Sequence, residues 1–283
     1  MNNSILSATA FAPGNISCIF VIKKTKSPAT SGSLGLGFTV NKGAIVTIKK
    51  LYNENKNVIY FNNKKINFPT VSSVIEKLTD GNVIVDIKSQ LPLGYGFGIS
   101  GAAALATAYS LNKLLKLKKS KKELALIAHI AEVENLTGLG DIVNQYYGGF
   151  LVKYESSCKF KAVRLPIKNK AVYCKHFSPI ETKRVISNEK IKNRINSAGI
   201  RALNKIRALD DKNPNLKNLI KISKEFSISS GLLKSKKITD TIKNIENNNG
   251  NASMIMLGNA VFSDINFRGS RKLIINDKGA YLL

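Results

Sequence analysis

Residues 91–104 read LPLGYGFGISGAAA, in which glycines alternate with larger residues before an Ala- and Leu-rich segment. Gly94, Gly96 and Gly98 allow the backbone to turn tightly and to approach a ligand closely. The helix that we expect after them points its unpaired amides and the positive end of its dipole toward the same space. The stretch therefore predicts a cradle for phosphate groups, with Ser100 placed either to cap the helix or to contact a phosphate or its metal.

Two other interpretations of these glycines stay open. One is an ordinary glycine-rich turn in front of a core helix. The other is a dinucleotide site, because Gly96, Gly98 and Gly101 match the spacing Gly-x-Gly-x-x-Gly. Pro92 separates the preceding strand from the loop, and Glu123 lies in a helical pattern rather than at a strand end, which argues against a dinucleotide site. No Gly-Lys-Ser/Thr sequence follows, so a P-loop lysine is absent from this loop.

A second group of candidates lies in residues 121–141. Residues 121–135 are apolar on nearly all sides, which predicts a buried helix. His129 and Glu132, three positions apart, are neighbours on its remaining polar stripe. A buried carboxylate needs a cation or several hydrogen bonds, and Mg²⁺ would satisfy Glu132. Asp141 follows two helix-breaking glycines, and alone it would be interpreted as an N-cap, with Glu132 as an ion-pair partner.

The phosphate loop favours a catalytic interpretation of these carboxylates. Phosphoryl transfer requires a phosphate cradle, Mg²⁺ on oxygen ligands, and a group that orients or deprotonates the attacking hydroxyl. Ser100, Glu132 and Asp141 can supply these parts.

Composition limits the class of protein. The 283 residues, 43% of them hydrophobic, predict a globular chain with one large domain or two moderate ones. The net charge of +26 favours anionic partners and leaves a basic RNA-binding protein as an alternative of a different class. The lysines crowded in residues 113–122 have no aromatic residues among them, so we interpret them as a solvated helix end rather than a nucleic-acid patch.

Cysteine content and hydropathy bear on location. Cys18, Cys158 and Cys174 are too few and too far apart for a disulfide framework or a zinc cluster, which favours a reducing, cytoplasmic location. No run of 18 apolar residues occurs, so we expect no membrane span.

The periodicity of apolar residues predicts an α+β fold. Residues 5–22 are interpreted as opening strands, and a strand pair is expected around the turn at residues 276–279. The other expected strands are residues 44–51, 57–61, 83–87, 149–154, 160–165 and 171–175, and the expected helices are residues 100–117, 121–135, 188–209 and 216–229.

These motifs resemble those of the galactokinase, homoserine kinase, mevalonate kinase and phosphomevalonate kinase (GHMP) superfamily. Its phosphate motif, Pro-x-Gly-x-Gly-x-Gly-Ser-Ser-Ala-Ala, is similar to residues 92–102, with Ile99 and Gly101 as departures. The longer pattern from His129 through residues 137–141 to Gly148 and Gly149 is similar to that of the archaeal pantoate kinases. So are the glycines and Ser33 of residues 32–37 and the stretch 252–262.

The resemblance implies a two-domain GHMP kinase fold. A ribosomal-protein-like N-terminal domain would cover residues 1–153, and a ferredoxin-like C-terminal domain would cover residues 154–283. Ser100 and Glu132 would hold Mg²⁺, and Asp141 would act on the primary hydroxyl of pantoate to give 4-phosphopantoate for coenzyme A biosynthesis. The implied ATP-binding residues are Pro92, Gly94, Tyr95, Gly96, Phe97, Gly98, Ile99, Ser100, Gly101 and Ala102.

The resemblance also implies substrate contacts at Ser33, His129 and Lys153, each of which has an equally good structural interpretation. Lys153 stands where the family is expected to have arginine, and it keeps the positive charge without the bidentate fork. The third superfamily motif keeps only Gly258, so we assign it no phosphate role. A GHMP kinase for another hydroxy acid or alcohol shares every motif and remains an alternative. Among partners, we expect no specific nucleic acid and allow for a homodimer.

Overall fold

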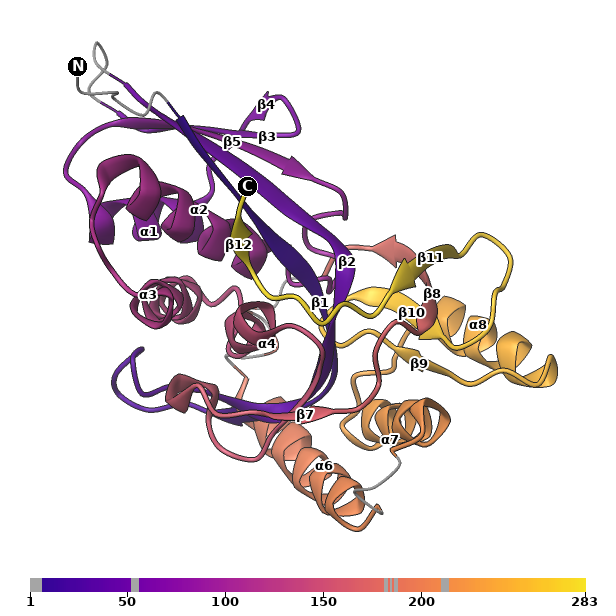
Figure 1. The fold of residues 1–283 in the computed structure, drawn as a ribbon. Coiled ribbons are helices and arrows are strands. Elements are labelled where there is room, and N and C mark those ends of the chain that lie inside the picture. The colour runs from indigo at the N-terminus through magenta and orange to yellow at the C-terminus, as the bar shows by residue number, and fades with distance from the viewer. Residues whose placement is uncertain (1–6, 52–55, 181–182, 184, 186–187, 210–213) are drawn as a thin grey trace.

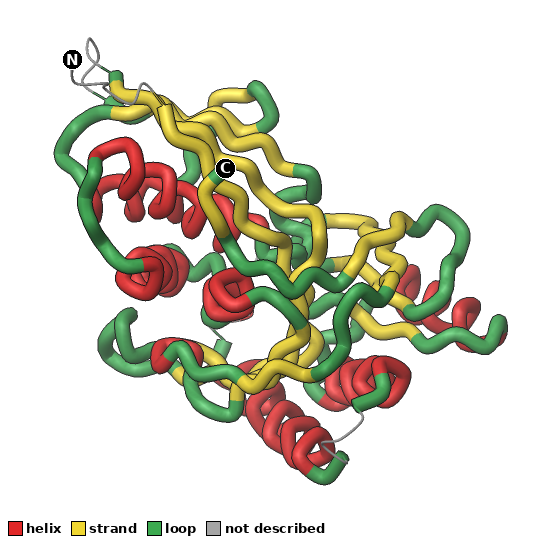
Figure 2. Tube along the Cα trace, viewed as in Figure 1, coloured by secondary structure: helices red, strands yellow, loops and turns green. Residues whose placement is uncertain are grey.

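The computed structural model describes residues 7–51, 56–180, 183, 185, 188–209 and 214–283. They form two β-sheets with helices packed against them, which confirms the α+β class (Figures 1 and 2). The first sheet has the order β12-β1-β2-β5-β3-β4, with β6 paired to β2 and β7 paired to β6. Its strands are β1 Ser7–Lys23, β2 Gly32–Lys50, β3 Val58–Phe61, β4 Lys64–Lys65, β5 Val83–Ser89, β6 Phe150–Lys153, β7 Val163–Leu165 and β12 Tyr281–Leu282.

Four helices cover one face of this sheet (Figure 1). They are α1 Pro69–Leu78, α2 Ile99–Leu115, α3 Lys121–Glu134 and α4 Asp141–Tyr147. α2 is buried on nearly all sides, because its small alanines allow close packing against the strands and against α1 and α3. α3 begins with a capping box in which Ser120 and Glu123 satisfy each other's backbone amides. The helices expected at residues 100–117 and 121–135 are confirmed within two residues.

The second sheet has the order β11-β8-β10-β9, and its pairs are antiparallel. Strand β10 lies between β8 and β9, which are joined by a helical crossover, so the arrangement is the split β-α-β unit of a ferredoxin-like domain. Its elements are β8 Ala171–Ser178, α6 Glu189–Arg207, α7 Leu216–Ser229, α8 Lys236–Asn247, β9 Ala252–Met254, β10 Asn259–Ser263 and β11 Arg271–Ile274.

β1 is shared by two hydrophobic cores. Ala10 and Ala12, in its first half, are buried in the core beneath α1–α3. Phe20, near its end, lies edge-on to Phe226 of α7 in the other core. Two irregularities in the pairing with β2, after Pro13 and after Ser17, bend the strand between these halves.

The end of the chain corrects one expectation. Residues 276–279 do not join a strand pair, because β11 pairs with β8 in the second sheet and β12 pairs with β1 in the first. The amide of Gly149 donates to Asn276 O and the amide of Ala280 donates to Gln145 O, so this turn packs against the end of α4. These tertiary hydrogen bonds outweigh the local turn signal.

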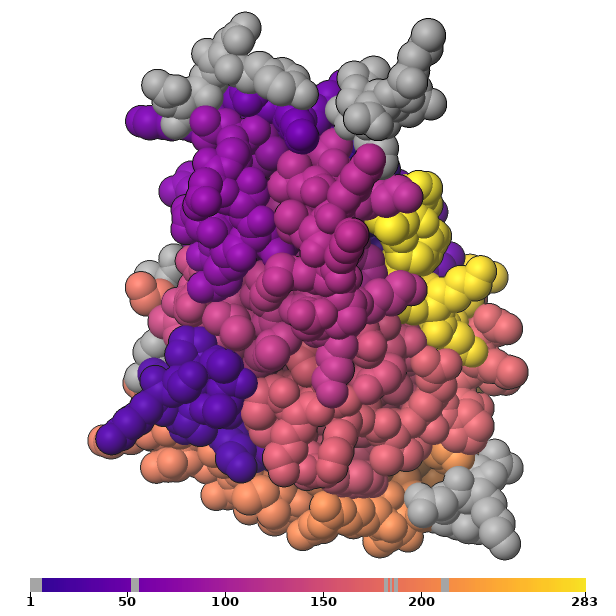
Figure 3. All heavy atoms as spheres, turned by 60° about the vertical axis from the view of Figure 1, so that its left-hand side comes forward, coloured from indigo at the N-terminus to yellow at the C-terminus, as the bar shows by residue number. Residues whose placement is uncertain are grey.

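The strand expected at residues 160–165 begins only at Val163. A 3-10 turn, Ser157–Lys159, precedes it, and Phe160 has a positive φ of 50° with its ring buried. The space-filling view shows the segment around these residues beside the turn that joins β1 and β2 (Figure 3). Cys158 Sγ lies 3.3 Å from Thr30 O at this contact.

Strands β7 and β12, both beyond Lys153, belong to the first sheet, and the division of the chain at Lys153 stays a prediction. Within the residues that the structure describes, every helix is too short or too polar to cross a membrane.

The contact between α6 and β1 yields a stability prediction. A Cβ atom on Gly199 would lie 2.6 Å from the backbone oxygen of Phe20. We therefore expect Gly199→Val to lower the free energy of unfolding by about 1–3 kcal/mol, measured by urea denaturation. Ile200→Val at the exposed neighbouring position is the control and should have little effect. Equal stability of the two variants would contradict this packing.

Candidate active site

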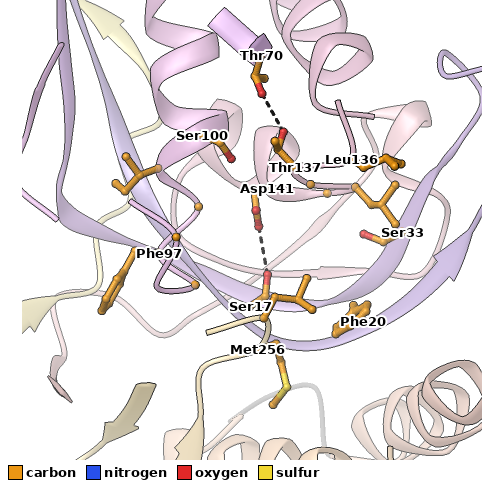
Figure 4. Close-up of a pocket in the computed structure, with 18 of the residues that line it drawn as sticks. Ser17, Phe20, Ser33, Thr70, Phe97, Ser100, Leu136, Thr137, Asp141 and Met256 are labelled. Atoms are coloured by element: carbon orange, nitrogen blue, oxygen red, sulfur yellow. Dashed lines mark hydrogen bonds between the residues drawn. The ribbon is translucent and has the colours of Figure 1, made fainter. Parts of the chain in front are cut away.

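A cavity of about 590 Å³ lies where β1, the start of α2, the residues before α4 and the loop before β10 meet (Figure 4). Ser17 comes from β1, Ser100 from α2, Asp141 from α4 and Met256 from that loop. Thr70 of α1 and Thr137 are joined by a hydrogen bond of 3.0 Å at its upper edge in the view. The cavity therefore depends on segments that are far apart in the sequence.

The glycine loop has the backbone form of an anion cradle. Gly94, Gly96 and Gly98 have positive φ angles of 87°, 86° and 60°, and Gly98 is the N-cap of α2. No side chain of the described residues caps α2, so its first amides remain available to a ligand. The loop is held at both ends, since Asn15 N donates to Phe97 O and Ile180 N donates to Gly94 O.

The predicted ATP-binding residues divide into two groups. Those that line the cavity are Gly94, Gly96, Phe97, Gly98, Ile99 and Ser100. The other four, Pro92, Tyr95, Gly101 and Ala102, lie outside the lining. The Tyr95 ring packs edge-on to His176 at 4.8 Å, and Ala102 is fully buried in the core. ATP contact by these four stays a prediction, and the backbone amide of Gly101 is among the free amides in the first turn of α2.

Gly258 has a role at this loop that the sequence did not suggest. A Cβ on Gly96 would lie 3.0 Å from Gly258 Cα, and Gly258 itself has no room for a side chain against Tyr95. The third motif therefore supports the phosphate loop from behind by close backbone packing.

Ser100 and Glu132 are in direct contact. Ser100 Oγ donates to Glu132 Oε1 at 2.9 Å, and Glu132 is fully buried behind it. Oε2 has no hydrogen-bond partner among the described residues. A Cβ on Gly101 or Gly138 would lie 3.0 or 2.7 Å from Oε2, so both glycines make room for the carboxylate. Burial, reinforced by the charge of Asp141, raises the pKa of Glu132 to about 8.

Asp141 is the first residue of α4 and reaches the cavity. Its Oδ1 accepts hydrogen bonds from Asn15 Nδ2 at 2.6 Å and from Ser17 Oγ at 3.2 Å, the latter drawn in Figure 4. Burial raises the pKa of Asp141, and Lys153, Asn15 and Ser17 oppose this shift. Ser100, Glu132 and Asp141 are thus brought together at one end of the glycine loop.

The three predicted substrate contacts have different positions. Ser33 lines the cavity. Lys153 also lines it, but its ammonium group donates to Gly140 O at 2.9 Å and to Asn144 Oδ1 at 3.0 Å. Burial lowers the pKa of Lys153 to about 8, against the effect of Asp141.

His129 is not brought to the cavity. It is fully buried outside the lining, and its Nε2 lies 2.9 Å from Ser31 O. Burial lowers its pKa. Because Ser31 is two residues before Ser33, this contact can position the cavity wall, but it gives His129 no direct contact with a ligand there.

Asn15, Ser17 and Asn144 also belong to this site, and they were not predicted from the sequence. Asn15 and Ser17 are two positions apart in the largely apolar middle of β1 and therefore point to the same side. That alternation was the available signal. Asn144 lies within a short helix of mixed polarity and carries no comparable signal.

The donor set suits Mg²⁺. The described residues contain no group of three His, Cys, Asp or Glu side chains that could hold a metal alone. Mg²⁺, however, is usually bound by one or two carboxylates together with substrate phosphates. An unpartnered buried oxygen of Glu132, beside the Ser100 hydroxyl and near a second carboxylate, fits that requirement.

Comparisons with known proteins agree with this geometry. The family model for the GHMP kinases N terminal domain matches residues 67–149. The pantoate kinase of Methanocaldococcus jannaschii is 37% identical over 257 residues, which are 89% of this chain and 90% of the relative. The pantoate kinase of Methanospirillum hungatei is 32% identical, covering 90% of this chain and 86% of that one.

Solved structures share the fold. A protein described as a phosphotransferase related to the CoA biosynthesis pathway superposes with a TM-score of 0.83, at 24% identity over 98% of both chains. Homoserine kinase from Cytophaga hutchinsonii superposes with a TM-score of 0.72, at 19% identity over 100% of this chain and 99% of that one.

The fold and the cavity, taken with these relatives, define an ATP-dependent small-molecule kinase of the GHMP superfamily. Within it, the chain belongs to the pantoate kinase family. A basic RNA-binding protein is not favoured, because the similarity to these kinases extends over about nine-tenths of the chain.

The buried carboxylate of Glu132 predicts a pH effect on stability. Its pKa rises from 4.5 to about 8 on folding, so the folded protein holds a proton that the unfolded chain loses, and stability falls as pH rises through this range. Between pH 5 and pH 8, with EDTA present, the free energy of unfolding of wild type should fall by about 3 kcal/mol more than that of Glu132→Gln, as measured by urea denaturation. Glu134→Gln, an exposed change at the end of the same helix, is the control. Parallel pH profiles for wild type and Glu132→Gln would contradict the prediction.

Proposed function

We propose that this chain transfers the γ-phosphoryl group of ATP to the primary hydroxyl of pantoate, giving ADP and 4-phosphopantoate for coenzyme A biosynthesis. The convergence of Ser100, Glu132 and Asp141 at one end of the glycine loop carries the proposal. The names of the relatives that match about nine-tenths of the chain support pantoate as the acceptor.

The glycine loop and the start of α2 bind the triphosphate. The uncapped amides of the helix and the positive end of its dipole face the cavity, so they stabilise the negative charge of the phosphates. Ser100 and Glu132 would hold Mg²⁺, which, when bound, neutralises charge on the β- and γ-phosphate oxygens.

Asp141 acts as the base for the acceptor hydroxyl. Its Oδ1 already accepts two hydrogen bonds, so its other oxygen takes the hydroxyl proton. The hydroxyl oxygen then bonds to the γ-phosphorus as the bond to the bridging oxygen of ADP breaks. A carboxylate whose pKa is raised by burial is a better base near neutral pH than an ordinary aspartate.

The acceptor lies on the side of the cavity lined by Ser33. Lys183 also lines the cavity and is exposed there, so it provides positive charge for anionic ligands.

A homodimer and a cytoplasmic location are part of the proposal. The cytoplasmic location is supported by the three cysteines, which are all free, and two of which are buried.

Substitution of Asp141 tests the catalytic assignment. Asp141→Asn keeps an oxygen that accepts from Asn15 and Ser17 but cannot take the hydroxyl proton. We expect kcat to fall by about 10²–10⁴-fold with the fold retained, as measured by coupled ADP release and thermal unfolding. Full activity of this variant would refute the role of Asp141.

The acceptor is tested by a panel. Pantoate, mevalonate, homoserine and shikimate, each supplied with ATP and Mg²⁺, should give the highest kcat/KM with pantoate, and EDTA should abolish turnover. Preference for another acceptor would reject pantoate while leaving the kinase class intact.

A further inference from the structure

A continuous line of hydrogen bonds joins Lys153 to Asp141 inside the protein. Lys153 Nζ donates to Asn144 Oδ1 at 3.0 Å, and Asn144 Nδ2 donates to Asn15 Oδ1 at 2.8 Å. Asn15 Nδ2 then donates to Asp141 Oδ1 at 2.6 Å. Lys153 is 5% exposed, and Asn15 and Asn144 are each 1% exposed, so water competes little for these contacts.

The chemistry of the two ends fixes the orientation of both amides. An ammonium group can only donate hydrogen bonds and a carboxylate can only accept them. Asn144 must therefore present its oxygen to Lys153, and Asn15 must present its nitrogen to Asp141. Either amide turned around would place two donors or two acceptors face to face, which is costly in a buried site.

The same line fixes the direction in which Asp141 points. Lys153 Nζ also donates to Gly140 O at 2.9 Å, directly before Asp141 in the chain. Ser17 Oγ donates to the same Oδ1 that Asn15 binds. Both donors hold one oxygen of Asp141, and no side chain of the described residues donates to the other oxygen. That second oxygen is left for the acceptor hydroxyl.

We infer that Lys153 is a positioning residue that acts on Asp141 through Asn144 and Asn15, rather than a contact for the substrate carboxylate. The inference rests on the proposed role of Asp141. The charge of Lys153 also opposes the rise in the pKa of Asp141 that burial causes, which helps keep the carboxylate ionised. Neither Asn15 nor Asn144 lines the cavity, so both act only through other residues.

Kinetics of two single variants test the inference. Lys153→Met removes the donor at one end, and Asn144→Leu removes the central link. Each should lower kcat about 10–100-fold and leave the KM values for pantoate and ATP within about twofold. Lys153→Arg keeps a donor and should retain more activity than Lys153→Met. A higher KM for pantoate with kcat unchanged in Lys153→Met would overturn the inference in favour of a substrate contact.

A double variant separates one connected line from independent effects. If Lys153 and Asn144 act in the same line, the Lys153→Met and Asn144→Leu double variant should lose little more kcat than the worse single variant. Losses that multiply would overturn the inference. In an Asp141→Asn background, Lys153→Met should lower the residual rate no further, because no base remains to be positioned. A further loss there would also overturn it.

Two controls guard against general destabilisation. Ser110→Ala removes another fully buried hydrogen bond, to Val46 O, far along α2 from the cavity, and should keep wild-type kcat. Asn144→Asp keeps the size of the side chain and can pair with Lys153, but it cannot donate to Asn15. A fully folded Asn144→Asp with reduced kcat supports the inference, and a fully active one overturns it.

The test of the proposed acceptor and the test of this inference are independent of each other. The same variants are assayed with whichever acceptor of the panel wild type uses best, so rejection of pantoate leaves the test of the line between Lys153 and Asp141 unchanged.

Discussion

Strand β1 packs against helices of both halves of the protein, and the polar middle of this strand holds Asp141. Its alanines lie in the core beneath α1–α3, and its later residues pack against α6 and α7. Between these apolar parts, irregular pairing with β2 bends the strand where Asn15 and Ser17 face Asp141. Because the strand is anchored on both sides, these two donors are fixed in position. The backbone amide of Asn15 also donates to Phe97 O, and this hydrogen bond joins the glycine loop to the same strand.

The site concentrates charge in a part of the protein that excludes water. Glu132 and Lys153 are buried. Burial raises the pKa of Glu132 and lowers the pKa of Lys153, and both shifts favour the neutral form of the side chain. Such an arrangement costs stability when a charged group lacks a partner, and it is typical of functional sites. Among the described residues, Glu132 Oε2 has no hydrogen-bond partner, whereas Lys153 already donates to Gly140 O and Asn144 Oδ1. This difference is why Glu132 fits a metal ligand and Lys153 fits a positioning role.

The glycines near the site serve different purposes. Gly98 adopts the left-handed conformation that ends the loop and begins α2. Gly101 and Gly138 instead leave space for the Glu132 carboxylate. Gly258 packs on the back of the loop at Tyr95 and Gly96, although we assigned no phosphate role to its motif from the sequence. A glycine pattern alone cannot separate these purposes, because each depends on what approaches the missing side chain.

The amino-acid sequence predicted the class of fold, the glycine loop before a buried helix, and the candidate residues Ser100, Glu132 and Asp141, because each of these depends on local spacing and periodicity. It also placed α7 at the bounds found, Leu216–Ser229. The tertiary structure fixes how the chain end is paired, since β12 joins β1 through residues that are more than 200 positions apart in the sequence. It likewise places His129 outside the cavity and directs the ammonium group of Lys153 to Gly140 O and Asn144 Oδ1. These contacts could not be predicted locally, because the acceptors belong to other segments of the chain. Asn15, Asn144 and Asp141 come together only when β1 and α4 pack, and neither segment alone contains that information.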